Sequence, residues 1–167
     1  MSNAVKAQPT RAPQKPVAPL SHPAVEPAEL LRRHLAFGWW TILIFLTIGL
    51  VLEGMHGLKV QSYLGVHQET RRLMWTLAHA HGTLLGVINL GFAYTLGTIV
   101  RWPDKSRNFA SVVLRAATIL MPAGFFLGGL FTYSGDPGLG ILLVPVGGVL
   151  LFMAVFAAAR AAARPKQ

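Results

Sequence analysis

The chain has 167 residues, of which 53% are hydrophobic and 13% charged, and it contains no cysteine. Soluble domains carry about 25% charged residues, so this composition, with its long uncharged runs, indicates an integral membrane protein. The missing cysteines exclude disulfides, thiolate metal sites, iron–sulfur clusters and cysteine nucleophiles. The formal net charge of +9 comes from basic residues near the ends of apolar runs, so no nucleic-acid partner is expected.

The first 27 residues are rich in proline and poor in large apolar side chains. They hold six of the eleven prolines, namely Pro9, Pro13, Pro16, Pro19, Pro23 and Pro27. Such a composition cannot bury enough apolar surface to fold. We therefore expect residues 1–27 to form a disordered cytoplasmic tail, with a docking arm as the alternative.

Four long apolar runs follow the tail, at about 35–55, 73–100, 109–133 and 138–160. Each is long enough to cross about 30 Å of hydrocarbon as a helix. The fold class expected is an all-α, integral membrane four-helix bundle over residues 28–164. A short turn at 134–138 joins the last two runs, whereas the loop at 57–72 is long enough to form a lid or a docking surface.

Basic residues are distributed unequally between the two ends of these predicted helices. Twelve fall on one side: Lys6, Arg11, Lys15, Arg32, Arg33, Arg101, Lys105, Arg107, Arg115, Arg160, Arg164 and Lys166. The other side has Lys59, Arg71 and Arg72. Because basic residues are retained on the cytoplasmic side, both termini are predicted to be cytoplasmic, and the protein is expected in the cytoplasmic (inner) membrane.

Ionisable side chains occur inside two of the predicted spans. Glu53 and His56 lie at the end of the first apolar run, and His79 and His81 lie near the start of the second. Such groups cost several kcal/mol in hydrocarbon unless they find partners, so they indicate a functional site. Since the loop at 57–72 joins the outer ends of the two helices, Glu53, His56 and His79 are expected at similar depth in the outer leaflet.

The helical periodicity separates the two histidines of the second run. At 100° per residue, His81 lies about 160° away from His79. His79 lies at the edge of a stripe of small or polar residues that favours close helix packing. The stripe consists of Gly82, Gly86, Asn89, Ala93 and Gly97. We therefore expect His79 to face the bundle interior and His81 to face a partner subunit, the interface or a distorted turn.

Histidines on neighbouring membrane helices are typical of haem b or metal binding. The expected cofactor ligands are His56 and His79, with His81 as the alternative to His79. Zinc or copper held by Glu53, His56 and His79 stays open, as does the absence of any cofactor. A di-iron site would need more carboxylates than this region contains. His22, His34 and His67 are expected to be solvated or interfacial.

Two short motifs resemble a known family. His34-Leu35-Ala36-Phe37-Gly38, followed by an apolar span, is similar to the opening of the catalytic subunit of haem–copper oxidases. Arg71-Arg72 ahead of Leu77-Ala78-His79, and then Gly86 and Asn89, resembles the second helix of that superfamily, most closely in its nitric-oxide-reductase and high-affinity oxidase branches. The resemblance covers residues 34–97. It implies a haem ligand at His79, or at His81 if the His81-Gly82 pair is matched instead.

The chain departs from that family in ways that limit the expectation. The family needs about twelve helices, a second haem ligand on a late helix and a histidine trio for a metal, none of which this chain has. The resemblance therefore implies a reduced haem-binding relative with His56 as the candidate second ligand, and it does not imply oxygen or nitric oxide reduction.

The function expected from the sequence is that of a small integral membrane subunit. It would bind haem b or a metal near the outer end of the first two helices, in electron transfer or in support of a respiratory-type complex. The alternatives are a non-catalytic accessory or assembly subunit and a proton or ion conduit that uses Glu53. The expected partners are the lipid bilayer and other membrane subunits or further copies of the chain. No catalytic residue is identified, so whether the protein is an enzyme stays open.

Overall fold

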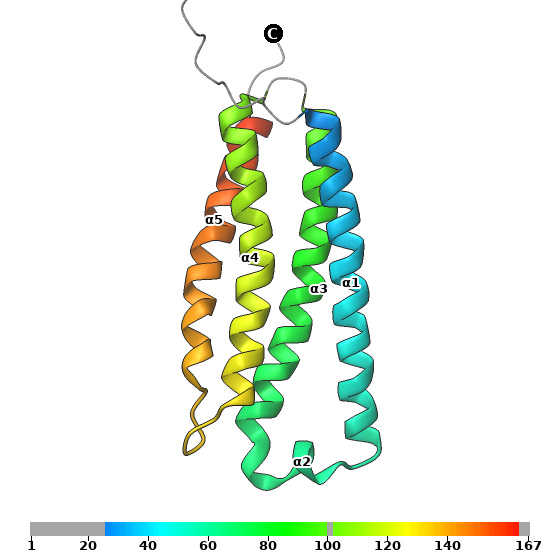
Figure 1. Ribbon diagram of the computed structural model, residues 1–167, viewed down its shortest axis with the longest axis vertical. Coiled ribbons are helices and arrows are strands. Elements are labelled where there is room, and N and C mark those ends of the chain that lie inside the picture. Colours follow the sequence, from blue (N-terminus) through cyan, green and yellow to red (C-terminus); the bar gives the residue numbers. More distant parts are fainter. Residues whose placement is uncertain (1–25, 100–101, 164–167) are drawn as a thin grey trace, which may run out of the picture.

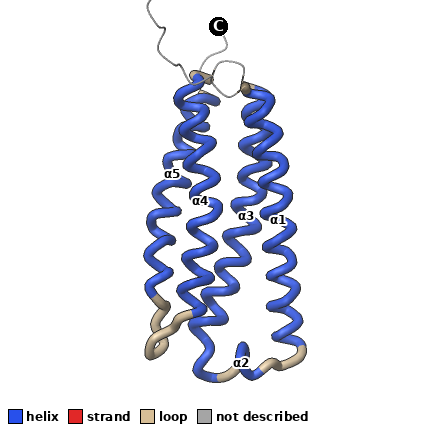
Figure 2. The backbone as a smooth tube through the Cα atoms, in the orientation of Figure 1, coloured by secondary structure: helices blue, strands red, loops and turns tan. Residues whose placement is uncertain are grey.

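The computed structural model describes residues 26–99 and 102–163, and this part of the chain is almost entirely helical (Figures 1 and 2). The long helices are α1 (Pro27–Gly57), α3 (Glu69–Thr98), α4 (Asp104–Leu130) and α5 (Leu143–Ala162). Short helical turns lie in the connections, namely α2 (Gln61–Leu64), η1 (Val66–Gln68) and η2 (Leu139–Leu142). The tail predicted at residues 1–27 lies outside the described residues except for its last two positions.

The long helices run alternately up and down, and α3 is the central one. It packs against α1 on one side and against α4 on the other, while α5 packs mainly on α4. The start of α1 and the end of α5 lie at one end of the molecule, and α2 and the connection between α4 and α5 lie at the opposite end (Figure 1). The helices therefore form a row of two hairpins, α1 with α3 and α4 with α5, rather than a ring around one core.

The predicted helical runs are confirmed, but the helices α1, α3 and α4 begin earlier than the apolar runs do. Helix α1 has Pro27 in its first turn, and Glu29 pairs with Arg32 at 3.0 Å and with Arg33 at 2.8 Å. Pairs of opposite charge three and four residues apart stabilise a helix. The polar first turn of α1 is thus helical although hydrophobicity alone does not reveal it.

Three helical segments are long and apolar enough to cross a membrane: Pro27–Gly57, Asp104–Leu130 and Leu139–Ala162. Their outward faces carry exposed large apolar side chains, among them Leu50 at 75% and Phe152 at 70% exposure. Such continuous apolar surface indicates a lipid environment. Helix α3 is not among the three, because it carries His79, His81 and Asn89 within its apolar stretch.

Glycines allow α1 and α3 to approach closely, as the small-residue stripe predicts. A Cβ atom at Gly86 would lie 2.6 Å from Ile42 Cγ1 and 3.1 Å from the carbonyl oxygen of Gly38. A Cβ atom at Gly82 would collide with the ring of Phe45. Small side chains at these positions therefore set the distance between the two helices.

Glycines also allow α4 and α5 to approach each other closely. A Cβ atom at Gly124 would lie 2.9 Å from Val144 Cγ2, and one at Gly147 would lie 3.0 Å from Met121 Cβ. The predicted turn between these helices is also present, with Ser134 and Gly135 at positive φ angles of 50° and 92°. In each hairpin, side chains of one helix thus pack directly onto the glycine backbone of the other.

Replacing Gly86 by leucine is expected to destabilise the protein by about 1–3 kcal/mol, because the new side chain has no space between α1 and α3. The matched control is Gly91→Ala on the same helix, where no atom lies within 4 Å of a new Cβ. That control should be neutral or stabilising by up to about 1 kcal/mol, the helix-propensity gain of alanine. Unfolding by denaturing detergent, followed by circular dichroism, measures both. Equal stability of Gly86→Leu and the parent would show that this interface is not closely packed.

Candidate functional site

A cleft of about 1070 Å³ opens between α1 and α3 at the end of the molecule where α2 lies. Its walls come from the last turns of α1 and the first turns of α3, and Tyr63 of α2 borders it. The polar and titratable side chains that line it are Glu53, His56, Tyr63, Glu69, Thr70, Arg72, Thr76 and His79. The cleft therefore combines apolar helix walls with the ionisable groups that the sequence singles out.

His79 is partly buried and is held in a defined orientation. Its Nδ1 lies 2.6 Å from the backbone carbonyl oxygen of Phe45 on α1. A carbonyl oxygen only accepts hydrogen bonds, so Nδ1 carries the proton and donates it. In the neutral ring, Nε2 then carries no proton and keeps its lone pair. Neutral imidazole binds metal ions through such a nitrogen. Histidine ligands of metals commonly have their other ring nitrogen anchored to a carbonyl in this way.

Gly49 makes room for the His79 ring. A Cβ atom at position 49 would lie 2.7 Å from His79 Nδ1 and 2.9 Å from its Nε2. The imidazole therefore lies against the bare backbone of α1 at the inner end of the cleft. Any larger residue at position 49 would displace the ring from the Phe45 carbonyl.

Glu53 and His56 line the same cleft but lie nearer its mouth. Both are solvent- or lipid-exposed, in contrast to His79. His56 is seven residues beyond Gly49, which is about 10 Å along a helix axis. The cleft thus brings together Glu53, His56 and His79 as lining residues, at staggered depths rather than at one level.

His81 faces the opposite way from His79, as its spacing predicts, but it does not face outward. Its ring lies 4.7 Å from the ring of Phe125 on α4, and its Nδ1 donates to the carbonyl oxygen of Leu77 at 2.8 Å. The expectation that His81 faces a partner subunit or the interface is therefore corrected. Because α3 lies between two helices, both of its faces are covered.

The described residues contain no group of three or more histidine and acidic side chains gathered closely enough to hold a metal ion. Glu53, His56 and His79 share the cleft without forming such a group. A bare zinc or copper ion needs three or four converging donors. A haem needs only one or two axial histidines.

A second polar cluster lies farther from α2, between the middle of the molecule and the end where α1 begins, and is completely buried. His34 on α1, Asn89 on α3, and Ser111 and Thr118 on α4 are each 2% exposed or less. His34 Nδ1 lies 2.8 Å from Asn89 Oδ1, and His34 Nε2 lies 2.8 Å from Ser111 Oγ. Asn89 Nδ2 donates to Thr118 Oγ1 at 2.9 Å. We call these four residues the inner network.

The donors and acceptors of the inner network match one another. Asn89 Nδ2 also donates to the carbonyl oxygen of Leu85, which fixes the orientation of its amide. Asn89 Oδ1 is then an acceptor, so His34 Nδ1 carries the ring proton and His34 Nε2 accepts from Ser111. Thr118 accepts from Asn89 and donates to the carbonyl oxygen of Leu114. Three helices are therefore joined by polar bonds inside the apolar core.

The expectation that His34 is solvated or interfacial is wrong, because its exposure is 0%. Both ring nitrogens are engaged, and the ring also packs 4.6 Å from that of Phe92. Neither nitrogen is free to bind a cofactor in this arrangement. Ser111 and Thr118 were not singled out by the sequence, although their spacing of two helical turns places them on one face with Asn89 opposite. His67 is exposed as expected, and His22 lies outside the described residues.

No protein-family model, curated protein or solved structure matches this chain. The assignment of function therefore depends on the geometry of the cleft and of the inner network.

Replacing Asn89 by leucine is expected to destabilise the protein by about 1–3 kcal/mol, since His34 loses its acceptor in a buried position. The matched control is Thr95→Ala on the same helix, whose hydroxyl bonds only the carbonyl oxygen of Gly91 in its own turn. That control should change stability little. Unfolding in mild detergent measures both variants. An Asn89→Leu protein as stable as the control would mean that the inner network does not fasten the helices.

Proposed function

We propose that this chain is a small integral membrane subunit that binds a b-type haem in the cleft between α1 and α3 and serves in electron transfer. His79 is the proposed axial ligand, and His56 is the candidate second ligand across the cleft. The observation that carries the proposal is the anchored imidazole of His79, whose Nδ1 is tied to the Phe45 carbonyl while Nε2 keeps its lone pair beside the cleft.

The size and the lining of the cleft suit an organic cofactor better than a bare ion. Its volume of about 1070 Å³ lies slightly above the usual range of small-molecule sites. Leu46, Leu50 and Leu73 line it together with the titratable groups. An amphiphilic cofactor with an apolar body and a polar edge suits such a lining.

Bound haem supplies one-electron chemistry, and its potential depends on the axial ligands and on their surroundings. The residues of this chain would hold and orient the cofactor. The Phe45 carbonyl fixes the His79 tautomer, and Gly49 gives the ring its position. Glu53 and Arg72 place opposite charges at the rim of the cleft. The resemblance of residues 34–97 to haem–copper oxidases, which implies a ligand at His79 or at His81, is in line with this role.

The membrane topology proposed with this function has four spans and both termini in the cytoplasm. Helix α3 has 30 residues, about 45 Å, and it lies between helices that are apolar enough to cross the bilayer. A polar helix is tolerated in a membrane when neighbouring helices cover its polar groups. The described basic residues at the end where α1 begins are Arg32, Arg33, Lys105, Arg107, Arg115 and Arg160, against Lys59, Arg71 and Arg72 at the other end.

A specific observation favours the accessory role as the second candidate. The inner network uses its polar groups for hydrogen bonds between helices and to carbonyl oxygens within them, with no group left for a ligand. The row of helices also leaves the apolar outer faces of α1 and α5 uncovered. A subunit that packs against a larger membrane complex would have this form.

The haem proposal is tested by the absorption spectrum of the full chain purified from a haem-replete host. The parent is expected to show a Soret band and a reducible b-type spectrum. His79→Ala should remove the band, because the anchored ligand is lost, and His56→Ala should weaken the band or change its spin state. His67→Ala, an exposed histidine of the outer connection, is the matched control and should leave the spectrum unchanged.

A colourless parent protein that takes up no haem on titration would overturn the haem proposal. The accessory role would then be the favoured function. A Soret band that persists in His79→Ala with unchanged shape would exclude His79 as the ligand.

The topology is tested by reporter fusions at the C-terminus and within residues 57–68. We expect a cytoplasmic reporter to be active at the C-terminus and inactive in the α1–α3 connection. Activity at both positions would mean that α3, α4 and α5 do not all cross the membrane.

A further inference from the structure

Arg115 is a cation within the apolar part of α4 for which the described residues provide no partner. It is only partly exposed, and its Nε is buried without a hydrogen bond. The carboxylates that form ion pairs in the described ranges are Glu29, with Arg32 and Arg33, and Asp104, with Arg107. A charged side chain in a membrane span without a partner is costly, so a partner beyond the described residues is expected.

An apolar groove lies between α1 and α4. Its α4 wall starts at Thr118, about one turn beyond Arg115, and continues toward the end of the molecule where α2 lies, the outer end in the proposed topology. It has a volume of about 330 Å³ and is lined by Phe37, Thr41, Ile44, Phe45, Ile48, Thr118, Ile119, Pro122, Ala123 and Phe126. The groove opens sideways, since Ile44 and Ile119 at its edges are more than half exposed. An occupant from the bilayer can therefore enter without moving a helix.

Arg115 continues the α4 wall of this groove toward the inner end. It precedes Thr118 by three residues and Ile119 by four, so the three side chains lie on one face of the helix. Side chains on a helix lean toward its N-terminus, which for α4 is the inner end. This preference predicts that the guanidinium lies between the end of the groove and the start of α4.

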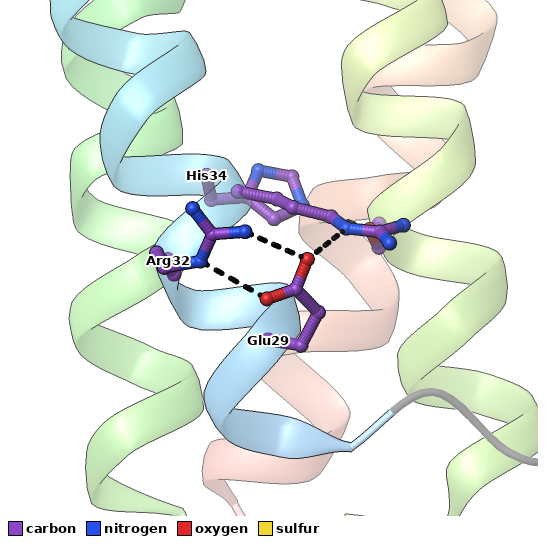
Figure 3. Close-up of polar contacts among 5 residues, drawn as sticks. Glu29, Arg32 and His34 are labelled. Carbon is purple, nitrogen blue, oxygen red and sulfur yellow. Dashed lines mark hydrogen bonds and ion pairs between the residues drawn. The ribbon is translucent and has the colours of Figure 1, made fainter.

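The surroundings of Arg115 are positive or neutral. His34, which faces Arg115 across the helices, is engaged through both ring nitrogens in the inner network. Glu29 is shared by Arg32 and Arg33 in the first turn of α1, and Figure 3 shows this pairing below His34. Two arginines against one glutamate leave a net positive charge on α1 above the groove. An anion is the complementary charge for this end of the groove.

We propose that the α1–α4 groove binds an anionic phospholipid of the inner leaflet, with one acyl chain in the groove and the phosphate at Arg115. The site lies apart from the haem cleft, which is between α1 and α3 at the opposite end. A phospholipid fits both parts of the site, because the groove is nearly all apolar along its length and the cationic Arg115 lies about one turn beyond its end. The lipid would fill the space between the two hairpins where α1 and α4 touch mainly through the inner network.

The test uses the full chain, delipidated in a neutral detergent, with phosphatidylglycerol or phosphatidylcholine of identical acyl chains added. Binding is measured by native mass spectrometry and by the shift in melting temperature. The parent should prefer phosphatidylglycerol. Arg115→Gln should reduce phosphatidylglycerol affinity about tenfold, the usual effect of losing a charge-assisted hydrogen bond. Arg115→Lys should keep most of it, because the charge remains.

The controls test separately the role of Arg115, the role of the groove and the need for a whole lipid. Arg160→Gln removes an exposed cation at the inner end of α5 and should leave the preference unchanged. Ala123→Phe fills the groove and should weaken both lipids alike, while inorganic phosphate alone should produce no shift. Circular dichroism confirms that each variant is folded. A parent without preference for phosphatidylglycerol, or an Arg160→Gln protein that loses as much affinity as Arg115→Gln, would overturn the proposal.

Discussion

The structure depends on the need of α3 for polar partners on both sides. This helix carries His79, His81 and Asn89 in the middle of the molecule, and none of them can be left facing hydrocarbon at low cost. His79 donates to a carbonyl of α1, and Asn89 bonds to His34 of α1 and to Thr118 of α4. Only a central position between α1 and α4 satisfies these groups together, and the row of two hairpins follows from it.

The helices were predictable because each is a long apolar run, and the contact face of α3 was predictable because Gly82 and Gly86 recur on one side of it. The burial of His34 was not. It lies in a helical turn beside Arg32 and Arg33, so its local sequence is typical of a solvated helix end. Its burial results from Asn89 and Ser111, which are 55 and 77 residues away in the chain. Contacts at such separation have no local pattern.

Part of the candidate cleft could be predicted from the sequence. The loop between the first two helices requires Glu53, His56 and His79 to lie near one another, and all three line the cleft. Their staggered depths could not be derived, because they depend on how far α1 extends past the His79 level. The inward direction of His81 was missed because the sequence argument assumed one bundle interior, whereas a central helix in a row has two covered faces.

The two polar clusters divide the α1–α3 hairpin into a fixed part and an open part. His79 and Asn89 are ten residues apart on α3, about 15 Å along its axis. On the Asn89 side, Gly38 and Gly86 bring the backbones together and the inner network ties both helices to α4. Beyond Gly49 the glycines of α1 no longer pack against α3, because an added Cβ at Gly54 or Gly57 would meet no atom within 4 Å. Leu50, Glu53 and His56 line the open cleft there instead. Because the inner end is fastened, the outer turns of α1 can adjust to an occupant of the cleft while the remaining contacts of the hairpin are kept.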